Sequence, residues 1–486
     1  MSALDEIRAE RMRKLALLEA QGINPYPNTT RRTHEIGQVL GGFLVLEKEG
    51  GNLVIAGRIR AIRTHGGSSF IDIDDGSGRM QLFLKKDEIG ADAFDLFIDT
   101  VDIGDFVEAA GTPMRTKSGQ ESLLLSSWRM LAKTLRPIPD EWYGFSDEDE
   151  RFRRRYLDML LNKDVLENAK KRSVFWNAVR TYLLAREFVE VETPVLENTT
   201  GGAEARPFVT HHNALDIDVY LRISAGELWQ KMLLVGGLPK TFEIGRIFRN
   251  EGMSREHLQD YTQLEFYQAY SDYEEGMRMV TDLYRHIAQE TFGTLVFTIG
   301  EHEVDLGKEW EIYDFCEILK REYGIDPLSA SIEEVKTALK AAGIEKDEAI
   351  SIERGVDLLW KKVRKTIAGP GFLIDVPVYL EPLAKRSEKN QEVVERFQVI
   401  LAGSEMGKGF SELNNPIDQR ERFERQQALR DAGDDEAQMA DMDFVEALEH
   451  GMPPAFGFGM SERLFSFLMD KDVREAQLFP LMRPRE

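Results

Sequence analysis

The chain has 486 residues and a formal net charge of −23 at pH 7, which argues against a protein that holds nucleic acid by bulk electrostatic attraction. No apolar run approaches the ~18 residues that a membrane-spanning helix needs, and the charged start MSALDEIRAERMRK has no apolar signal core, so we expect a cytoplasmic protein. The single cysteine, Cys316, excludes internal disulfides and thiolate zinc sites.

A predicted helical arm spans residues 1–50. Its first helix runs from Ser2 to about Gln21, because Ser2 is a residue type that caps helices and apolar residues then recur at roughly helical spacing. Gly22 and the following NPYP end this helix. We expect this amphipathic arm to be a packing element.

Residues 51–134 predict a small β-barrel. Five segments alternate apolar and polar side chains, and turn sequences such as DDGSG separate them. The segments are LVIAGRIRAIR, SSFIDID, RMQLFLK, DFVEAAGTPM and ESLLLSSWRML. Five short strands in so few residues suit a barrel of the OB type.

The second and third predicted strands place an aromatic ring on the polar face of this barrel. Ile71 and Ile73 face the core, so Phe70 lies on the opposite, outward face. Gln81 lies on the outward face of the next strand, and Arg63 comes from the first strand. An outward aromatic ring beside arginine and glutamine is what base stacking and recognition of base edges require. On the pattern alone, the alternative is a set of scattered surface residues with one exposed ring.

Residues 135–150, rich in proline and acidic side chains, predict a linker to a larger domain over residues 151–486. This domain mixes helices with hairpin strands, which indicates an α+β fold and not a repeating βαβ winding. The predicted helices are Val165–Arg186 and Tyr273–Thr291, and the predicted strands are Val189–Thr193, Lys240–Phe248 and Gln263–Tyr270. Residues 301–367 predict a mostly helical insertion.

The stretch FRNEGMSREHLQDYTQLEFYQAY concentrates charged and aromatic side chains around one turn. Taken alone, such a stretch is most simply the solvated face of a hairpin. In a strand, however, Arg249 and Glu251 lie two apart and share a face, and Glu265 and Tyr267 share a face of the returning strand. Arginine offers fixed donors to phosphate or carboxylate oxygens. The hairpin therefore predicts a site for an amino acid and a nucleotide side by side.

Several motifs, in order along essentially the whole chain, resemble the class II lysyl-tRNA synthetases of the bacterial type. INPYP and the barrel resemble that family's N-terminal anticodon-binding domain. FVEVETPVLENTTGGAEARPFVTHHNALDIDVYLRIS resembles its first motif and the segment after it, FRNEG…YTQLEFY the second motif, and GFGMSERL the third. GSEMGKGFSELN resembles its amino-acid and metal segment. The resemblance implies an OB-fold barrel followed by a class II catalytic domain with an antiparallel sheet flanked by helices.

The resemblance also implies the residues of an ATP site. Arg249 would bridge the substrate carboxylate and the α-phosphate, and Arg463 would clamp the γ-phosphate, which makes these two the catalytic residues. Glu251 would hold adenine and Tyr261 would stack on it. His257 matches the same ATP-binding set.

The amino-acid site is implied in the same way. Gly202 and Glu227 would receive the α-amino group of the substrate. Glu265, Tyr267 and Glu412 would surround its side-chain ammonium.

Magnesium and the anticodon complete the implied ligands. Glu405 would bind Mg²⁺ together with Gln398, which stands where the family has a glutamate and so should bind the metal less tightly. Phe70, Gln81 and Arg63 match the anticodon readers.

Three further places depart from the family pattern. In the third motif, Ser461 and Glu462 precede Arg463. The family usually has Asp before this arginine and repeats the spacing between glycines once more. Glu256 stands where the family has an arginine that faces the triphosphate, although Arg255 is adjacent. Lys408 replaces an asparagine near the side-chain ammonium, so we expect its stem to turn outward or its head to pair with a carboxylate beyond the substrate.

The implied activity is ATP-dependent ligation of L-lysine to tRNA(Lys) through a lysyl-adenylate. One alternative is an aspartyl- or asparaginyl-type synthetase, which shares the fold but needs a cation where Glu412 stands. Another acylates a protein lysine, but such relatives lack the barrel. A third is an inactive tRNA-binding paralogue, which would have lost Arg249 or Arg463. A homodimer is expected because the first motif builds the dimer interface in this family, and we expect no membrane or DNA partner.

Overall fold

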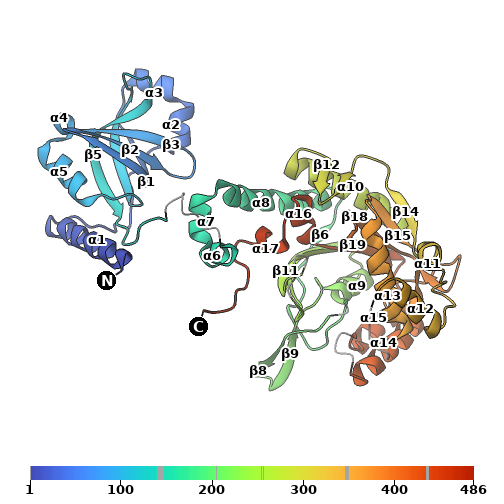
Figure 1. The fold of residues 1–486 in the computed structure, drawn as a ribbon. Helices are drawn as coiled ribbons and strands as arrows, with labels where there is room; N and C mark the ends of the chain where they lie inside the picture. Colours follow the sequence, from blue (N-terminus) through green and yellow to red (C-terminus); the bar gives the residue numbers. More distant parts are fainter. Residues whose placement is uncertain are drawn as a thin grey trace. The chain divides into compact units, whose positions relative to one another are not determined.

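The computed structural model describes residues 2–139, 147–203, 205–252, 254, 257–344, 350–433 and 437–485. The chain forms two compact units, Met1–Leu157 and Asp158–Glu486, and each has its own hydrophobic core (Figure 1). Within the described ranges, no helix is long and apolar enough to cross a membrane. Residues 140–146 of the predicted linker lie outside the described residues, so the linker boundaries stay a prediction.

A helical arm precedes the barrel of the first unit. It contains α1 (Ala3–Ala20), α2 (Ile36–Gly41) and α3 (Phe43–Glu49). The Ser2 hydroxyl accepts a hydrogen bond from the Asp5 N–H and caps α1, as predicted. The packing of α1 depends on charge as well as on apolar surface, because the buried Arg11 guanidinium donates to the carbonyl oxygen of Ile103 at 2.9 Å.

Five strands of the first unit close into a barrel in the order β1-β2-β3-β5-β4, which confirms the predicted OB-type barrel. They are β1 (Leu53–His65), β2 (Ser68–Asp74), β3 (Arg79–Lys85), β4 (Phe106–Arg115) and β5 (Glu121–Ala132), with α4 (Lys86–Ile89) and α5 (Ala91–Thr100) between β3 and β4. Alternate residues of β2 are buried, and Ile71 and Ile73 face the core as predicted.

The second unit is built on an eight-stranded sheet in the order β14-β15-β18-β19-β20-β11-β10-β6. The strands are β6 (Val189–Glu190), β10 (Lys240–Phe248), β11 (Asp260–Ala269), β14 (Glu311–Asp314), β15 (Gly371–Ile374), β18 (Arg396–Leu401), β19 (Ser404–Ser411) and β20 (Ala455–Ser461). The β10–β6 and β14–β15 pairs are parallel, and the other pairs are antiparallel. The α+β class is therefore confirmed.

Helices cover both faces of this sheet (Figure 1). On one face lie α8 (Lys163–Leu184) and α10 (Tyr273–Phe292). On the other lie α9 (Glu227–Val235), α11 (Phe315–Tyr323), α12 (Ile332–Ala341), α13 (Ile352–Val363), α14 (Pro416–Asp431) and α15 (Met442–Glu449). Because neighbouring residues of a strand point to opposite faces, Phe266 packs toward α8 and α10, whereas Glu265 and Tyr267 face α9.

Two short helices stand at the boundary between the units: α6 (Glu148–Arg153) lies in the first unit, and α7 (Arg155–Leu161) begins there and ends in the second. The smaller elements of the second unit are β7 (Leu196–Glu197), β8 (Val209–His212), β9 (Ile217–Leu221), β12 (Val296–Ile299), β13 (His302–Asp305), β16 (Val376–Pro377), β17 (Val393–Val394), α16 (Arg463–Leu468) and α17 (Val473–Ala476). The short 3₁₀ turns η2 (Arg364–Thr366) and η3 (Val378–Leu380) follow α13 and β16.

The segment predicted as a helical insertion, residues 301–367, is not helical throughout. It carries α11, α12 and α13, but β13 and β14 precede them, and β14 forms one edge of the main sheet. Each strand has only four residues, HEVD in β13 and EIYD in β14, and neither shows a regular alternation of charged and apolar side chains. So short a pattern does not distinguish a strand from a loop in the sequence.

Candidate active site

The β10–β11 hairpin carries the charged residues that the sequence singles out. Glu265 lies opposite Glu243 in the hairpin, and both side chains are buried. The Tyr267 hydroxyl donates to Glu265 Oε2 at 2.9 Å, and the Ala225 N–H donates to Oε1 at 2.9 Å. Burial and the negative charge of Glu227 raise the pKa of Glu265, which these hydrogen bonds offset only in part. The predicted common face of Glu265 and Tyr267 is confirmed.

Two glutamates from separate elements pair with one buried ammonium group, and a third, Glu265, lies beside them. Lys231 of α9 donates to Glu227 Oε1 at 2.7 Å, and its Nζ lies 2.5 Å from Oε2 of Glu412, which follows β19. Burial by itself lowers the pKa of Lys231, but Glu227 and Glu412 outweigh burial, so the net pKa is raised. Burial raises the pKa of Glu412 despite Lys231, and repulsion from Glu227 and Glu265 adds to it. We name Glu227, Glu265 and Glu412 the acidic cluster.

Gly202 lies against the acidic cluster. Its φ is +84°, and a β-carbon at this position would come within 2.6 Å of Ser224 Oγ and 2.7 Å of the β-carbon of Glu227. Both the backbone conformation and this close approach require glycine. The structure thus brings together Gly202 and Glu227, the pair predicted at the substrate α-amino group.

Two arginines and a tyrosine form a second part of the site. The Arg249 guanidinium carbon lies 5.9 Å from the ring centre of Tyr261. Burial raises the pKa of Tyr261, while Arg249 and Arg463 lower it and Glu251 raises it. Arg249, Arg463 and Glu251 thus all act electrostatically on the Tyr261 hydroxyl. Of these four predicted ATP-site residues, Arg249 and Tyr261 are in direct contact.

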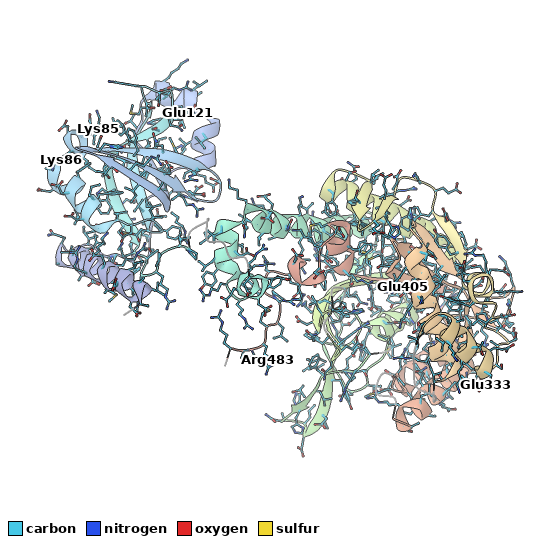
Figure 2. The ribbon with its side chains drawn as sticks, in the orientation of Figure 1. Lys85, Lys86, Glu121, Glu333, Glu405 and Arg483 are labelled. Atoms are coloured by element: carbon cyan, nitrogen blue, oxygen red, sulfur yellow. The ribbon has the colours of Figure 1, made fainter. Side chains whose placement is uncertain are left out.

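Glu405 of β19 lies among the strands of the second unit, beside α13 (Figure 2). The Trp360 indole N–H donates to Glu405 Oε1 at 2.7 Å, and Arg364 Nε lies 3.8 Å from the same oxygen. Although burial opposes the shift, Arg364 and Trp360 hold the pKa of Glu405 below its usual range, and Arg463 acts in the same direction. The carboxylate stays ionised at neutral pH and fits a magnesium ion shared with substrate phosphates.

Gln398 fits a metal less well than Glu405 does. It is 8% exposed, and its Oε1 already accepts a hydrogen bond from Arg396 on the same strand. Within the described ranges, no group of three or more histidine, cysteine, aspartate or glutamate side chains is arranged to hold a metal. A metal role for Gln398 stays a prediction, and the guanidinium of Arg396 at the same oxygen disfavours a cation there.

Lys408 of β19 pairs with a carboxylate outside the acidic cluster. Its Nζ lies 3.2 Å from Glu381 Oε2, and its side chain is 46% exposed. Glu381 also forms an ion pair with Arg396, whose Nε lies 2.8 Å from Glu381 Oε1. The pairing of the Lys408 head with a carboxylate agrees with the prediction, and the position of that carboxylate beyond the substrate stays a prediction.

Glu462, the residue that departs from the third-motif pattern, connects α8 and the segment after α17 to the start of α16 through its side-chain contacts. It is fully buried, pairs with Arg172 of α8, and accepts a hydrogen bond of 2.7 Å from Gln477 Nε2. The Ser461 hydroxyl accepts from the backbone N–H of Arg463 at 3.3 Å. These contacts fix the start of α16 and therefore the direction in which Arg463 leaves it.

The loop between β10 and β11 carries the last predicted ATP residue. His257 is exposed, and its Nδ1 lies 2.7 Å from Ser254 Oγ. The predictions about Glu256 and Arg255 lie outside the described residues. Their relation to the triphosphate stays a prediction.

In the first unit, the predicted anticodon residues lie on adjacent strands of the barrel. Phe70 of β2 stacks on Phe83 of β3, with ring centres 4.6 Å apart and planes 2° from parallel. Arg63 lies opposite Phe70, and its guanidinium donates two hydrogen bonds to Asp72. Gln81 accepts a hydrogen bond of 2.9 Å from a serine of β5. The alternation of residues in β2 and β3 puts both Phe70 and Phe83 on the outward face, and the structure stacks the two rings there.

Two family descriptions match the chain. Residues 53–138 match the OB-fold nucleic acid binding domain. Residues 147–483, more than half of the chain, match the tRNA synthetases class II (D, K and N). The chain belongs to the class II tRNA synthetases.

Relatives of this synthetase match it over nearly the full length. It is 44% identical to a lysine--tRNA ligase of Roseiflexus sp. (strain RS-1), over 99% of this chain and 100% of the relative. It is 43% identical to a lysine--tRNA ligase of Moorella thermoacetica, over 100% of this chain and 99% of the relative. It is 41% identical to a lysine--tRNA ligase of Thermotoga maritima, over 99% and 97%. The predicted resemblance to bacterial lysyl-tRNA synthetases is confirmed.

Sequence reasoning missed three residues of the synthetase site: Lys231, Trp360 and Glu381. Lys231 has a local signal, because it lies four residues after Glu227 on one helix, the spacing of an ion pair. Trp360 and Glu381 lie far along the chain from the groups that they contact. Only the fold brings them to the site.

Proposed function

We propose that this synthetase uses ATP to activate L-lysine as lysyl-adenylate and transfers the lysyl group to tRNA(Lys). The observation that carries the proposal is the acidic cluster, where Glu227 and Glu412 share the ammonium of Lys231 and the buried Glu265 adds a third carboxylate beside them. Among the described residues, no donor makes a hydrogen bond to the buried Glu412 Oε1. A substrate with two ammonium groups supplies both positive charge and donors, without which buried carboxylates are costly.

We propose the following binding mode for lysine. Gly202 and Glu227 receive the α-amino group. Glu265, Tyr267 and Glu412 hold the side-chain ammonium, with the Tyr267–Glu265 hydrogen bond fixing the carboxylate. The shared face of β11 and the closeness of α9 support this division.

Arg249 and Arg463 carry the proposed chemistry. Arg249 bridges the lysine carboxylate and the α-phosphate of ATP, and Arg463 clamps the γ-phosphate. A carboxylate oxygen of lysine attacks the α-phosphorus, the bond to the bridging oxygen breaks, and pyrophosphate leaves. The fixed guanidinium charges stabilise the negative charge that develops on the phosphoryl oxygens, and alignment of the reactants lowers the entropic barrier. A terminal ribose hydroxyl of the tRNA then attacks the carbonyl carbon, and AMP leaves.

Adenine and magnesium have separate proposed partners. Glu251 and Tyr261 hold the adenine ring, and His257 contributes to the same ATP site. Glu405 holds magnesium, with Gln398 as a predicted second oxygen ligand. When bound, the metal neutralises phosphate charge.

The outward face of the barrel is the proposed anticodon site. Phe70, stacked on Phe83, offers a ring surface for a base. Arg63 and Gln81 lie on the neighbouring strands and supply donors and acceptors for base edges. The match to an OB-fold nucleic acid binding domain supports this assignment.

The alternative substrates fit the acidic cluster less well. An aspartyl or asparaginyl enzyme belongs to the same matched family, but an aspartate side chain would face the negative charge of Glu265 and Glu412. An inactive paralogue is disfavoured because Arg249 and Arg463 are both present.

We also propose that the synthetase is a homodimer. The segment that resembles the first motif exposes several apolar side chains, which burial against a second copy would cover. They are Val189, Val195, Leu196, Val209, Leu215 and Ile217. Light scattering tests this proposal through the mass in solution. The cytoplasmic location and the lack of a membrane or DNA partner stay predictions.

Pyrophosphate exchange tests the substrate. The purified protein is given ATP, magnesium and labelled pyrophosphate with each of the twenty amino acids in turn, without tRNA. We expect exchange into ATP with L-lysine. A faster exchange with aspartate or asparagine would overturn the substrate assignment, and no exchange with any amino acid would favour the inactive paralogue.

A further inference from the structure

Lys231 is a charged side chain that the proposed reaction does not use, although it lies in the middle of the acidic cluster. It is 1% exposed, and its ammonium bridges Glu227 of α9 and Glu412 after β19. The rings of Phe410 and Tyr267 lie 5.2 Å and 5.9 Å from Nζ. An ammonium held by two carboxylates and faced by aromatic rings is fixed in place.

The charges around Lys231 do not balance. Glu227 from α9 and Glu412 after β19 pair with its ammonium, and Glu265 and Tyr267 from β11 face these two carboxylates. When all three carboxylates are ionised, they and the one ammonium leave an excess of two negative charges. Lysine at neutral pH brings two ammonium groups, while its carboxylate is assigned to Arg249. The cluster is therefore neutralised by a diamino acid and not by an amino acid with one ammonium group.

Without the ammonium of Lys231, the cluster would carry three uncompensated charges. Buried carboxylates in that situation take up protons instead of remaining ionised. A protonated Glu412 no longer attracts the substrate ammonium, so the bound proton competes with lysine. Lys231 thus favours the ionised form of Glu412 and fixes where the oxygens of Glu227 and Glu412 point.

We propose that Lys231 is a positioning residue that sets the charge of the lysine pocket: its ammonium neutralises one of three buried glutamates and orients Glu227 and Glu412 for the two ammonium groups of the substrate. This inference rests on the proposed function. Lys231 itself does not contact the reacting atoms, and it acts through the two glutamates.

The test compares a neutral side chain of similar shape with a bulkier charged one. Lys231→Met and Lys231→Arg are assayed in the full-length protein by lysine-dependent pyrophosphate exchange. If charge matters, Arg is the better substitute: we expect the KM for lysine to rise about a hundredfold in Lys231→Met, as for loss of one partner of a buried ion pair, and about tenfold or less in Lys231→Arg. A packing role predicts the reverse order. Met equal to or better than Arg would overturn the proposal.

Chemical rescue provides a second readout. Lys231→Ala lacks the three carbons and the nitrogen that propylammonium supplies. Added propylamine should therefore raise the kcat/KM of this variant for lysine at least tenfold. The uncharged 1-propanol should not. This variant also replaces Lys231→Met if that protein does not fold. Absence of rescue in a folded Lys231→Ala protein would count against the proposal.

Two controls separate this inference from the proposed function. Lys240→Met removes another lysine of the second unit, whose Nζ donates only to the carbonyl oxygen of Arg186, and should leave exchange unchanged. The wild-type protein is assayed alongside. Failure of wild-type exchange with lysine contradicts the proposed function, whereas normal wild-type exchange with unaltered Lys231 variants contradicts only the role of Lys231.

Discussion

The Trp360 indole of α13 donates a 2.7 Å hydrogen bond to Glu405 of β19. A helix from the segment 301–367 therefore contacts the carboxylate that we propose for magnesium. Loss of a side chain that orients a metal ligand typically lowers metal affinity by about 10-fold to 100-fold. The segment consequently has a role in the site and is not only peripheral.

Trp360→Phe should weaken magnesium dependence, because Glu405 loses the donor that fixes its orientation. We expect the magnesium concentration for half-maximal pyrophosphate exchange to rise about tenfold. Trp310→Phe is the matched control, since that indole donates to the carbonyl oxygen of Leu306 in the core on the opposite face of the sheet. Equal magnesium curves for Trp360→Phe and wild type would contradict the contact's importance.

Glu412→Gln should impair lysine activation strongly. It removes one partner of the Lys231 ion pair and one acceptor proposed for the substrate ammonium. Loss of one partner of a buried pair costs about 3–5 kcal/mol, so kcat/KM for lysine in the exchange assay should fall by about two to four orders of magnitude. Glu333→Gln on the exposed face of α12 is the control (Figure 2). Unchanged lysine dependence in Glu412→Gln would place the pocket elsewhere.

Lys408→Asn should have a small effect. The Lys408 head is paired with Glu381 and is half exposed, so it does not oppose the substrate cation. We expect lysine specificity to be kept and the apparent lysine affinity to change by less than ~1.4 kcal/mol, a factor of ten. A variant that binds lysine a hundredfold more tightly would show that the native ammonium faces the pocket.

Glu197→Gln should stabilise the second unit at high pH. Burial raises the pKa of Glu197 from 4.5 to about 7, although the Trp229 indole donates to it at 3.1 Å. Between these values the folded protein keeps a proton that the unfolded chain releases, so stability falls as pH rises through this window. Gln has no such loss, so the variant should be about 1–3 kcal/mol more stable at pH 8. Thermal melting should show a higher midpoint at pH 8 and similar midpoints at pH 4.5.

Phe70→Ala should separate tRNA charging from amino-acid activation. Loss of one base stack costs roughly 1–3 kcal/mol, so aminoacylation at limiting tRNA should slow by about tenfold to a hundredfold. Pyrophosphate exchange without tRNA is the internal control and should not change, because the barrel has its own core. Normal charging by this variant would mean that the Phe70–Phe83 pair is not the anticodon surface.

The parts of this structure that the sequence predicts are those with a local pattern. The two-residue period places Ile71 and Ile73 inside the barrel and Phe70 outside. The same rule puts Glu265 and Tyr267 on one face of β11. In both cases a single strand carries the whole signal, so no knowledge of its neighbours is needed.

The parts that the sequence does not predict depend on distant contacts. Lys231 and Glu227 are neighbours on α9, but nothing local shows that Glu412 arrives from β19 to share the ammonium. Glu381 pairs with Lys408 across separate segments in the same way. The strand β14 is too short to show a period, and only its pairing with β15 defines it.

Direct charging of tRNA tests the central claim of lysine ligation. A tRNA(Lys) transcript is incubated with the protein, ATP, magnesium and one labelled amino acid, and acid-precipitable label is counted. We predict that lysine is attached to this transcript, that aspartate and asparagine are not, and that a changed anticodon lowers the rate. Attachment of aspartate or asparagine in preference to lysine, or no attachment by a protein that is folded, would contradict it.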